Sequence, residues 1–410
     1  MKIYPLVASL LFHSVTTASA QIAVQADTLY TMTGDLKPLR NGVVLCSKDG
    51  KIERVGQLGE VNIPEGYRLL KAAVATPGFI DAHTTVGLSG ILNLDRHDQE
   101  QLETSAPIQP ELRAVDAYNG RDPLVQWIRE LGITTIHTGH APGALVAGQT
   151  MILKTNVPAI TDPEKNTLRP FAMIASTLGS GGFGRGGKSP GTRAKSLAML
   201  REHLLKAQRH LKKKTEAKED EKPEPNLRLD AMAAVLEGQT PLLVTAKRHQ
   251  DIAAALRLQR EFNFPLILDG ASEAYLLLEE IKAAKVPVII HPTMARPYGE
   301  NENITFTLAA KLHAAGIPFA FQSGYEAYVP KTRVVHFEAA LSVAYGLPHE
   351  VALAGCTSAA AEILGIGNRI GSLQKGLEAD IALFDGDPLE TVTHCTGVII
   401  DGKMVSKETK

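Results

Sequence analysis

The chain has 410 residues, of which 44% are hydrophobic, 21% charged and 5% aromatic, a composition that excludes disordered and fibrous proteins. It has 43 basic and 44 acidic residues, so no global field directs it to nucleic acid or to an anionic membrane. We therefore expect a small-molecule substrate or ligand in a local pocket, and no nucleic-acid partner. The length suits one large domain and one smaller domain.

The first residues predict an export signal. Lys2 precedes an apolar stretch over Leu6–Phe12, and Ala18-Ser19-Ala20 is a small-residue cleavage pattern. The stretch is shorter than the roughly 18 apolar residues that a membrane anchor needs, and no later segment could span a bilayer. We expect residues 1–20 to be a signal peptide, and a mature periplasmic or extracellular chain that begins at Gln21.

Three cysteines are too few for a disulfide scaffold in an exported chain. We expect Cys46, Cys356 and Cys395 to be small core residues. A Cys46–Cys395 bridge is the alternative, and it requires the two end segments to be adjacent.

Short β-rich runs separated by turns occupy residues 21–75, and the last forty residues show the same pattern. These runs are 22–26, 28–32, 42–46, 51–55, 379–384 and 397–400.

Between the two ends, short apolar runs typical of buried parallel strands alternate with amphipathic helical patterns. The eight runs are 74–80, 133–136, 151–153, 171–174, 242–244, 266–268, 288–290 and 319–321, and the helical patterns are 250–262, 273–284, 304–315 and 333–345. This count favours an α/β fold with a (β/α)8 TIM barrel. A doubly wound sheet, the alternative, would have a glycine-rich turn after its first strand, where Asp81-Ala82-His83 stands instead.

Residues 179–240 interrupt the alternation. Helical patterns at 195–211 and 228–237 predict a helical insertion over one mouth of the barrel. The mixed charges of 206–225 indicate a solvated helix and turn, with a recruitment surface as the alternative. Gly182–Ser189 formally matches a phosphate-binding loop, but Pro190-Gly191 follows where a helix should run, so we expect a loop and no nucleotide.

The most informative stretch is 75–85, Ala-Thr-Pro-Gly-Phe-Ile-Asp-Ala-His-Thr-Thr, where a buried strand delivers Asp81 and His83 at its end. A second signature follows near the carboxyl end, with Ile363-Leu364-Gly365, Gly371-Ser372-Leu373 and Ala379-Asp380-Ile381-Ala382. With these two signatures the chain resembles the amidohydrolase superfamily, specifically its imidazolonepropionase-like and prolidase-like branch of metal-dependent hydrolases.

The resemblance implies a TIM barrel beside a small β-sandwich built from both chain ends. The implied domains are a sandwich over 21–75 and 366–410, and a barrel over 76–365 with the insertion at about 179–240. The implied reaction is hydrolysis of C–N bonds in cyclic amides or small peptides, with one or two divalent metals that activate water.

Most of the family's chemical positions are changed in this sequence. Thr85 replaces the second His of Asp-x-His-x-His, and Thr245 stands where the fifth strand usually ends in His. The sixth strand ends in Asp269-Gly270 instead of a His. The eighth reads Ser323-Gly324 instead of Ser-Asp, so the usual proton shuttle is missing.

A relocated site could use other residues at the same mouth. Its candidate ligands, for at most one metal with zinc the most suitable, are His83, His137, His140, Asp269 and His291. The alternative is that these histidines are hydrogen-bonded structural residues. We assign no catalytic residue, although Asp269 is a candidate.

Arg193, Arg296 and Lys331 could hold a substrate carboxylate or could be surface charges, and none is singled out. Two functions stay open: a divergent hydrolase, or a catalytically inactive barrel that binds a ligand or an active paralogue. Assembly into a homo-oligomer also stays open.

Overall fold

The computed structural model describes residues 21–90, 98–184, 189–218, 223–293, 295–325 and 334–409. The expected signal peptide and Lys331 lie outside these ranges. No helix within them is both long and apolar enough to cross a membrane. The described chain has a mixed α/β fold.

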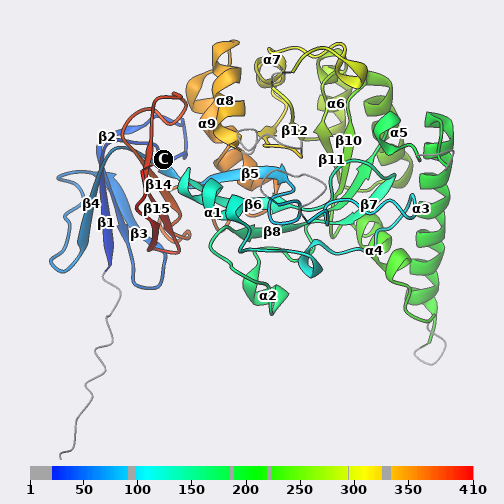
Figure 1. Ribbon diagram of the computed structural model, residues 1–410, viewed down its shortest axis with the longest axis horizontal. Coiled ribbons are helices and arrows are strands. Elements are labelled where there is room, and N and C mark those ends of the chain that lie inside the picture. Colours follow the sequence, from blue (N-terminus) through cyan, green and yellow to red (C-terminus); the bar gives the residue numbers. More distant parts are fainter. Residues whose placement is uncertain are drawn as a thin grey trace, which may run out of the picture.

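Both ends of the chain meet in one seven-stranded sheet, ordered β16-β15-β14-β4-β1-β2-β3 (Figure 1). Strand β1 pairs antiparallel with β2 and parallel with β4, and β14 pairs antiparallel with β4. Side chains from both ends, including Val24, Val44, Ile381 and Ile399, fill one apolar cluster. The strands are β1 (Ile22–Leu29), β2 (Leu39–Cys46), β3 (Ile52–Gln57), β4 (Arg68–Pro77), β14 (Ile381–Phe384), β15 (Cys395–Ile400) and β16 (Lys403–Ser406).

The apolar run 74–80 is not the single barrel strand that its sequence predicts. Strand β4 ends at Pro77 in the end sheet, and β5 (Phe79–Thr84) belongs to the central strands. Gly78 stands at the change between the two sheets, where a Cβ would lie 2.2 Å from the Thr134 side chain. The glycine thus permits the close passage that carries the chain from one sheet into the other.

The central strands form a six-stranded sheet, ordered β13-β12-β11-β10-β9-β7, and a three-stranded sheet, ordered β5-β6-β8. Strands β9 to β13 are parallel, and a bridge between Thr84 and Gly324 connects the two sheets. Asp81 strengthens this connection by accepting a hydrogen bond from the Ser323 backbone N at 2.9 Å. The remaining strands are β6 (Ile133–Thr138), β7 (Val146–Gln149), β8 (Met151–Lys154), β9 (Ile174–Thr177), β10 (Leu242–Ala246), β11 (Leu266–Gly270), β12 (Val288–Ile290) and β13 (Phe319–Phe321).

The expectation of eight parallel strands is wrong for the third run. Strand β8 pairs antiparallel with β6, and β7 pairs antiparallel with β9, so the segment 146–154 runs against its neighbours and connects the two sheets. An apolar run predicts burial but carries no information on strand direction, which explains the error. Strand β9 also starts at Ile174, where the predicted run 171–174 ends.

Alternate side chains of the central strands face opposite ways. Leu243, Ile267 and Ile289 lie in an inner cluster, whereas Leu242 and Leu268 lie in an outer cluster with the helices. The helices are α1 (Pro123–Glu130), α2 (Pro163–Asn166), α3 (Arg193–Glu216), α4 (Leu227–Leu236), α5 (His249–Phe262), α6 (Leu278–Ala284), α7 (Leu308–Ala315), α8 (Val335–Ala344), α9 (His349–Gly355) and α10 (Ser358–Ile363).

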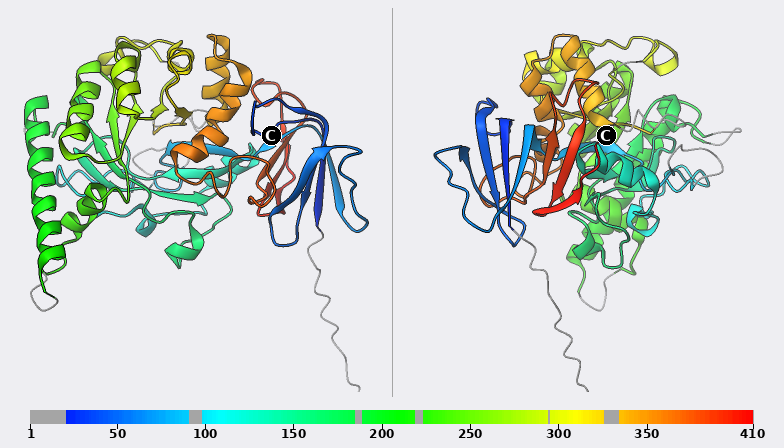
Figure 2. Two further views of the ribbon diagram at one scale, coloured as in Figure 1. Left: turned by 180° about the vertical axis from the view of Figure 1, so that it is seen from behind. Right: turned by 60° about the vertical axis from the view of Figure 1, so that its left-hand side comes forward.

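The two helices of the insertion belong to this outer layer. Leu200 and Leu204 of α3 and Met232 of α4 lie in the outer cluster, and α3 packs against α4 and α5 at one edge of the molecule (Figures 1 and 2). The structure therefore differs from the expectation that the insertion covers a barrel mouth. Helix α3 begins at Arg193 with Thr192 as its N-cap, and no helix starts at Ser189.

Cys46, Cys356 and Cys395 are all buried and free. Cys46 lies in the core of the end sheet and Cys395 in the outer cluster, so the alternative Cys46–Cys395 bridge is not formed. Burial raises the pKa of Cys46 and of Cys395 to about 12, which makes both thiols poor nucleophiles.

Candidate functional site

His83 and Asp269 form a buried pair at the carboxyl ends of parallel strands. His83 is in β5 and Asp269 in β11, and Nδ1 of His83 lies 2.9 Å from Oδ1 of Asp269. The side chains are 1% and 0% exposed. Two residues 186 positions apart are therefore brought together at the carboxyl ends of strands, where parallel α/β sheets bind their ligands.

Asp269 is the centre of a hydrogen-bond network. Besides His83, it accepts hydrogen bonds from Oγ1 of Thr245 at 2.5 Å and from Nε2 of Gln322 at 2.6 Å. Burial would raise the pKa of Asp269, but the charge and hydrogen bond of His83, with the other two donors, lower it below its ordinary value. Asp269 is thus held as a carboxylate.

The second nitrogen of His83 is available. Nε2 is buried and has no hydrogen-bond partner among the described residues. Because Asp269 accepts from Nδ1–H, Nε2 of the neutral ring carries the lone pair. The Tyr325 ring lies close by, with its centroid 6.2 Å from that of His83. This orientation is that of a histidine general base held by a carboxylate.

His137 is next to His83, with 5.5 Å between ring centroids, but both of its nitrogens are used. Nδ1 donates to the Ala82 carbonyl at 2.6 Å, and Nε2 lies 2.6 Å from the Thr150 hydroxyl. Burial, with the neighbouring His83, lowers the pKa of His137 to about 3, so the ring is neutral. His137 has no lone pair left for a metal.

His140 and His291 lie near the His83–Asp269 pair but are not hydrogen-bonded to it among the described residues. His140 packs over Gly148, and burial lowers its pKa to about 4. Nδ1 of His291 lies 3.8 Å from Oε2 of Glu338, which itself accepts from the Thr293 backbone N at 2.7 Å. Its ring centroid is 5.9 Å from that of Tyr325. In the described part of the chain these candidate ligands therefore do not form one cluster with the pair.

The residues at the family's ligand positions do not fit a metal. The Thr85 hydroxyl lies 3.1 Å from that of Ser89, and the Thr245 hydroxyl donates to Asp269. Within the ranges that the structure describes, no three His, Cys, Asp or Glu side chains are grouped as a metal would require. A catalytic zinc normally has three protein ligands, whereas His83 offers one free nitrogen here.

The cationic candidates are not equivalent. Arg193 is bidentate to Asp251 at 2.8 and 3.0 Å and lies 3.3 Å from Glu300, so it is already paired. Arg296 is exposed. Sequence reasoning overlooked Lys247, which follows β10 directly and has no ion pair or side-chain hydrogen bond among the described residues. Its place two residues after Thr245, at a family ligand position, could have drawn attention to it.

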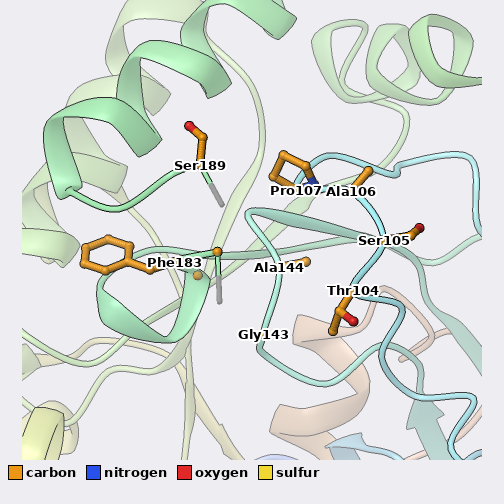
Figure 3. A pocket seen from close by; sticks show the side chains of 10 residues that line it. Thr104, Ser105, Ala106, Pro107, Gly143, Ala144, Phe183 and Ser189 are labelled. Carbon is orange, nitrogen blue, oxygen red and sulfur yellow. The ribbon is translucent and has the colours of Figure 1, made fainter. Parts of the chain in front are cut away.

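A cavity of about 140 Å³ lies beside the segments that follow β6 and β9 (Figure 3). Thr104, Ser105, Phe183 and Ser189 line it, together with small residues, and no ionisable side chain is among the described residues of its wall. The other wall residues are Ala106, Pro107, Gly143, Ala144, Gly182 and Gly184.

Comparisons with known proteins agree with this architecture. The model of the Amidohydrolase family matches residues 329–405. An amidohydrolase from Thermotoga maritima is 27% identical in sequence, with a TM-score of 0.87 over 94% of this chain and 100% of that one. The chain is similar to amidohydrolases in both sequence and fold.

Solved structures of lower sequence identity share the fold alone. A Xaa-Pro dipeptidase with bound methionine is 14% identical, with a TM-score of 0.57 over 94% of this chain and 99% of that chain. A zinc-bound adenosine deaminase from Xanthomonas campestris is 13% identical, with a TM-score of 0.54 over 94% and 92%.

A curated sequence relative is the amidohydrolase tasK of Hapsidospora irregularis, 26% identical over 372 residues and 82% of this chain. The chain spans only 36% of the length of that relative.

Proposed function

We propose that this protein hydrolyses C–N bonds of small amides, cyclic amides or short peptides, with His83 as general base in place of a metal-activated water. The observation that carries the proposal is the buried His83–Asp269 pair, whose Nε2 has no partner among the described residues. The likeness to amidohydrolases supports the reaction class.

The central strands are, in this proposal, a distorted (β/α)8 barrel, and the seven-stranded end sheet is the family's small β-sandwich. The bridge from Thr84 to Gly324 and the antiparallel segment 146–154 support a closed barrel, because they connect the two central sheets on both sides. Closure would bring the carboxyl ends of β5, β10, β11 and β13 around one mouth.

The chemistry follows from the orientation of His83. Nε2 takes a proton from water as the water oxygen attacks the amide carbonyl carbon, and the imidazolium then protonates the leaving nitrogen as the C–N bond breaks. Asp269 keeps Nδ1–H in place and stabilises the imidazolium. A positioned base of this kind accounts for about 10²–10⁴ in rate, so turnover should be slower than in metal-dependent relatives.

The second candidate is a catalytically inactive barrel that binds a ligand or an active paralogue. The observation that favours it is the set of hydroxyls at former ligand positions. Thr85 and Thr245 are buried, and both hydroxyls are bonded within the protein. In this case His83 and Asp269 stabilise the fold and do not act on substrate.

An activity assay decides between the two candidates. Protein dialysed against EDTA is incubated with dihydrouracil, hydantoin, N-acetyl amino acids and dipeptides, beside the His83→Asn variant. The matched control is His394→Asn, because His394 makes the same bond to Asp385 at 2.9 Å but on the surface. We expect hydrolysis that survives EDTA and His394→Asn, and that falls at least about 10²-fold in His83→Asn.

Loss of activity in EDTA with recovery on adding zinc, or full activity of His83→Asn, would overturn the proposed chemistry. No turnover of any panel compound by the wild-type protein would favour the inactive barrel.

We further propose that the protein acts outside the cytoplasm after removal of residues 1–20.

A further inference from the structure

We infer that Lys247 binds an anionic group of the ligand beside the His83–Asp269 pair, so that the ligands of this site are amides that carry a carboxylate. The inference rests on the proposed function for the identity of the site, but it concerns binding and not turnover.

Lys247 is placed at the mouth by the strand before it. Strand β10 ends at Ala246, and Thr245 within it donates to Asp269. Lys247 lies close to Gly270, the residue after Asp269: a Cβ built on Gly270 would be 3.5 Å from the His291 carbonyl oxygen, 3.7 Å from Cγ2 of Thr245 and 3.8 Å from Cγ of Lys247. The aliphatic part of Lys247 is therefore adjacent to the end of β11, directly after Asp269 of the buried pair.

The charge of Lys247 has no local counterion. Its side chain is half-buried and makes no ion pair among the described residues. The neighbouring carboxylates are already bonded to other groups: Asp269 to His83, Thr245 and Gln322, and Glu273 to His249 and Asn303. The ammonium of Lys247 is thus available to a bound carboxylate, and such charge-assisted hydrogen bonds are stronger than neutral ones.

Other cations near this end of the strands are less suitable. Arg193 is held by Asp251, and Arg248 bonds the Gly299 carbonyl at 3.0 Å and lies 3.2 Å from Glu302. Arg296 is exposed. Lys247 is, within the described part of the chain, the cation at this mouth that is both half-buried and unpaired.

The test is calorimetric binding with paired probes. N-acetyl-alanine, -leucine, -phenylalanine and -proline are each titrated as the free acid and as the carboxamide. The proteins are wild type, Lys247→Met, Lys247→Arg and Lys282→Met, the last removing an exposed lysine of α6. We expect at least one acid to bind at least about tenfold more tightly than its amide.

In Lys247→Met that preference should disappear, whereas Lys247→Arg and Lys282→Met should keep it. Equal affinity for acid and amide, an unchanged preference in Lys247→Met, or no binding of any acid would overturn the inference. A binding preference without hydrolysis would support the inference while contradicting the proposed reaction. Equal hydrolysis of amides with and without a carboxylate would support the proposed reaction while contradicting the inference.

Discussion

Lys154 connects the central strands to the end sheet through a buried ion cluster. Its Nζ lies 2.8 Å from Glu378, 2.9 Å from Asp380 and 2.5 Å from Asp401, and its side chain is 7% exposed. Burial would lower the pKa of Lys154, but the charges of Asp380 and Asp401 outweigh it and raise the pKa. Lys154→Met removes the ammonium that these carboxylates share.

The loss of the Lys154 ammonium should mainly affect Asp380, which then stays buried without a cation in the described part of the chain. Glu378 keeps Arg369 at 2.8 Å, and Asp401 is half exposed. The Asp380 side chain is 3% exposed and pairs with no other cation among the described residues. Removing one partner of a buried pair typically costs about 3–5 kcal/mol, and an exposed pair contributes about 1 kcal/mol or less. We expect Lys154→Met to lower the free energy of unfolding by about 3–5 kcal/mol at neutral pH.

The pH dependence gives a second readout. Burial raises the pKa of Asp380 to about 6, above the ordinary value of 3.8, so its ionisation opposes folding above pH 6 and this effect fades as the pH falls toward 4. Without Lys154 the pKa rises further, and Asp380 becomes neutral at mildly acidic pH. The difference between Lys154→Met and wild type should therefore shrink at about pH 5.

Urea unfolding followed by circular dichroism at about pH 7.5 and about pH 5 measures both effects. Lys165→Met is the matched control, because Lys165 is 82% exposed and its partner among the described residues is the nearby Asp162. Lys154→Arg keeps the charge and covers the case in which Lys154→Met does not fold. If Lys154→Met lowers the free energy of unfolding by less than about 1 kcal/mol, or by the same amount at both pH values, the reasoning is refuted.

Three further predictions concern other parts of the chain. Burial lowers the pKa of His336 from 6.5 to about 3, so His336 stays neutral in the fold but becomes protonated in the unfolded chain below pH 6.5. The free energy of unfolding should therefore decrease by about 1.4 kcal/mol per pH unit as the pH falls below 6.5. His336→Leu should make this decrease less steep, and an unchanged slope would contradict the prediction. The intact mass of the exported protein should correspond to a chain that begins at Gln21. A mass that includes Met1 would disprove cleavage. Thr85→His should leave metal content and turnover near wild type, since Thr245 and Gly324 still differ from the family pattern; tight zinc binding by this variant would show otherwise.

Much of the architecture could be predicted from local patterns. Amphipathic periodicity located α5 and most of α3, because their apolar residues recur at helical spacing. The resemblance also led to His83 and Asp269 as site residues. Their mutual hydrogen bond could not be predicted, since it depends on how strands far apart in sequence are aligned.

The parts that the sequence did not reveal depend on strand direction and tertiary contact. Nothing in Met151–Lys154 distinguishes an antiparallel strand from a parallel one, yet that direction brings Lys154 to the end sheet. The role of Gly78 depends on the approach of Thr134 from another strand. Lys247 becomes notable only when its neighbours are known to be bonded elsewhere.

The central claim is that His83 works with Asp269 and not with a metal. Metal content per chain, measured on the purified mature protein without added metal, tests it most directly. Because the described residues provide His83 with no set of three ligands, we predict well below one zinc per chain. One or two tightly bound metals per chain would contradict the claim.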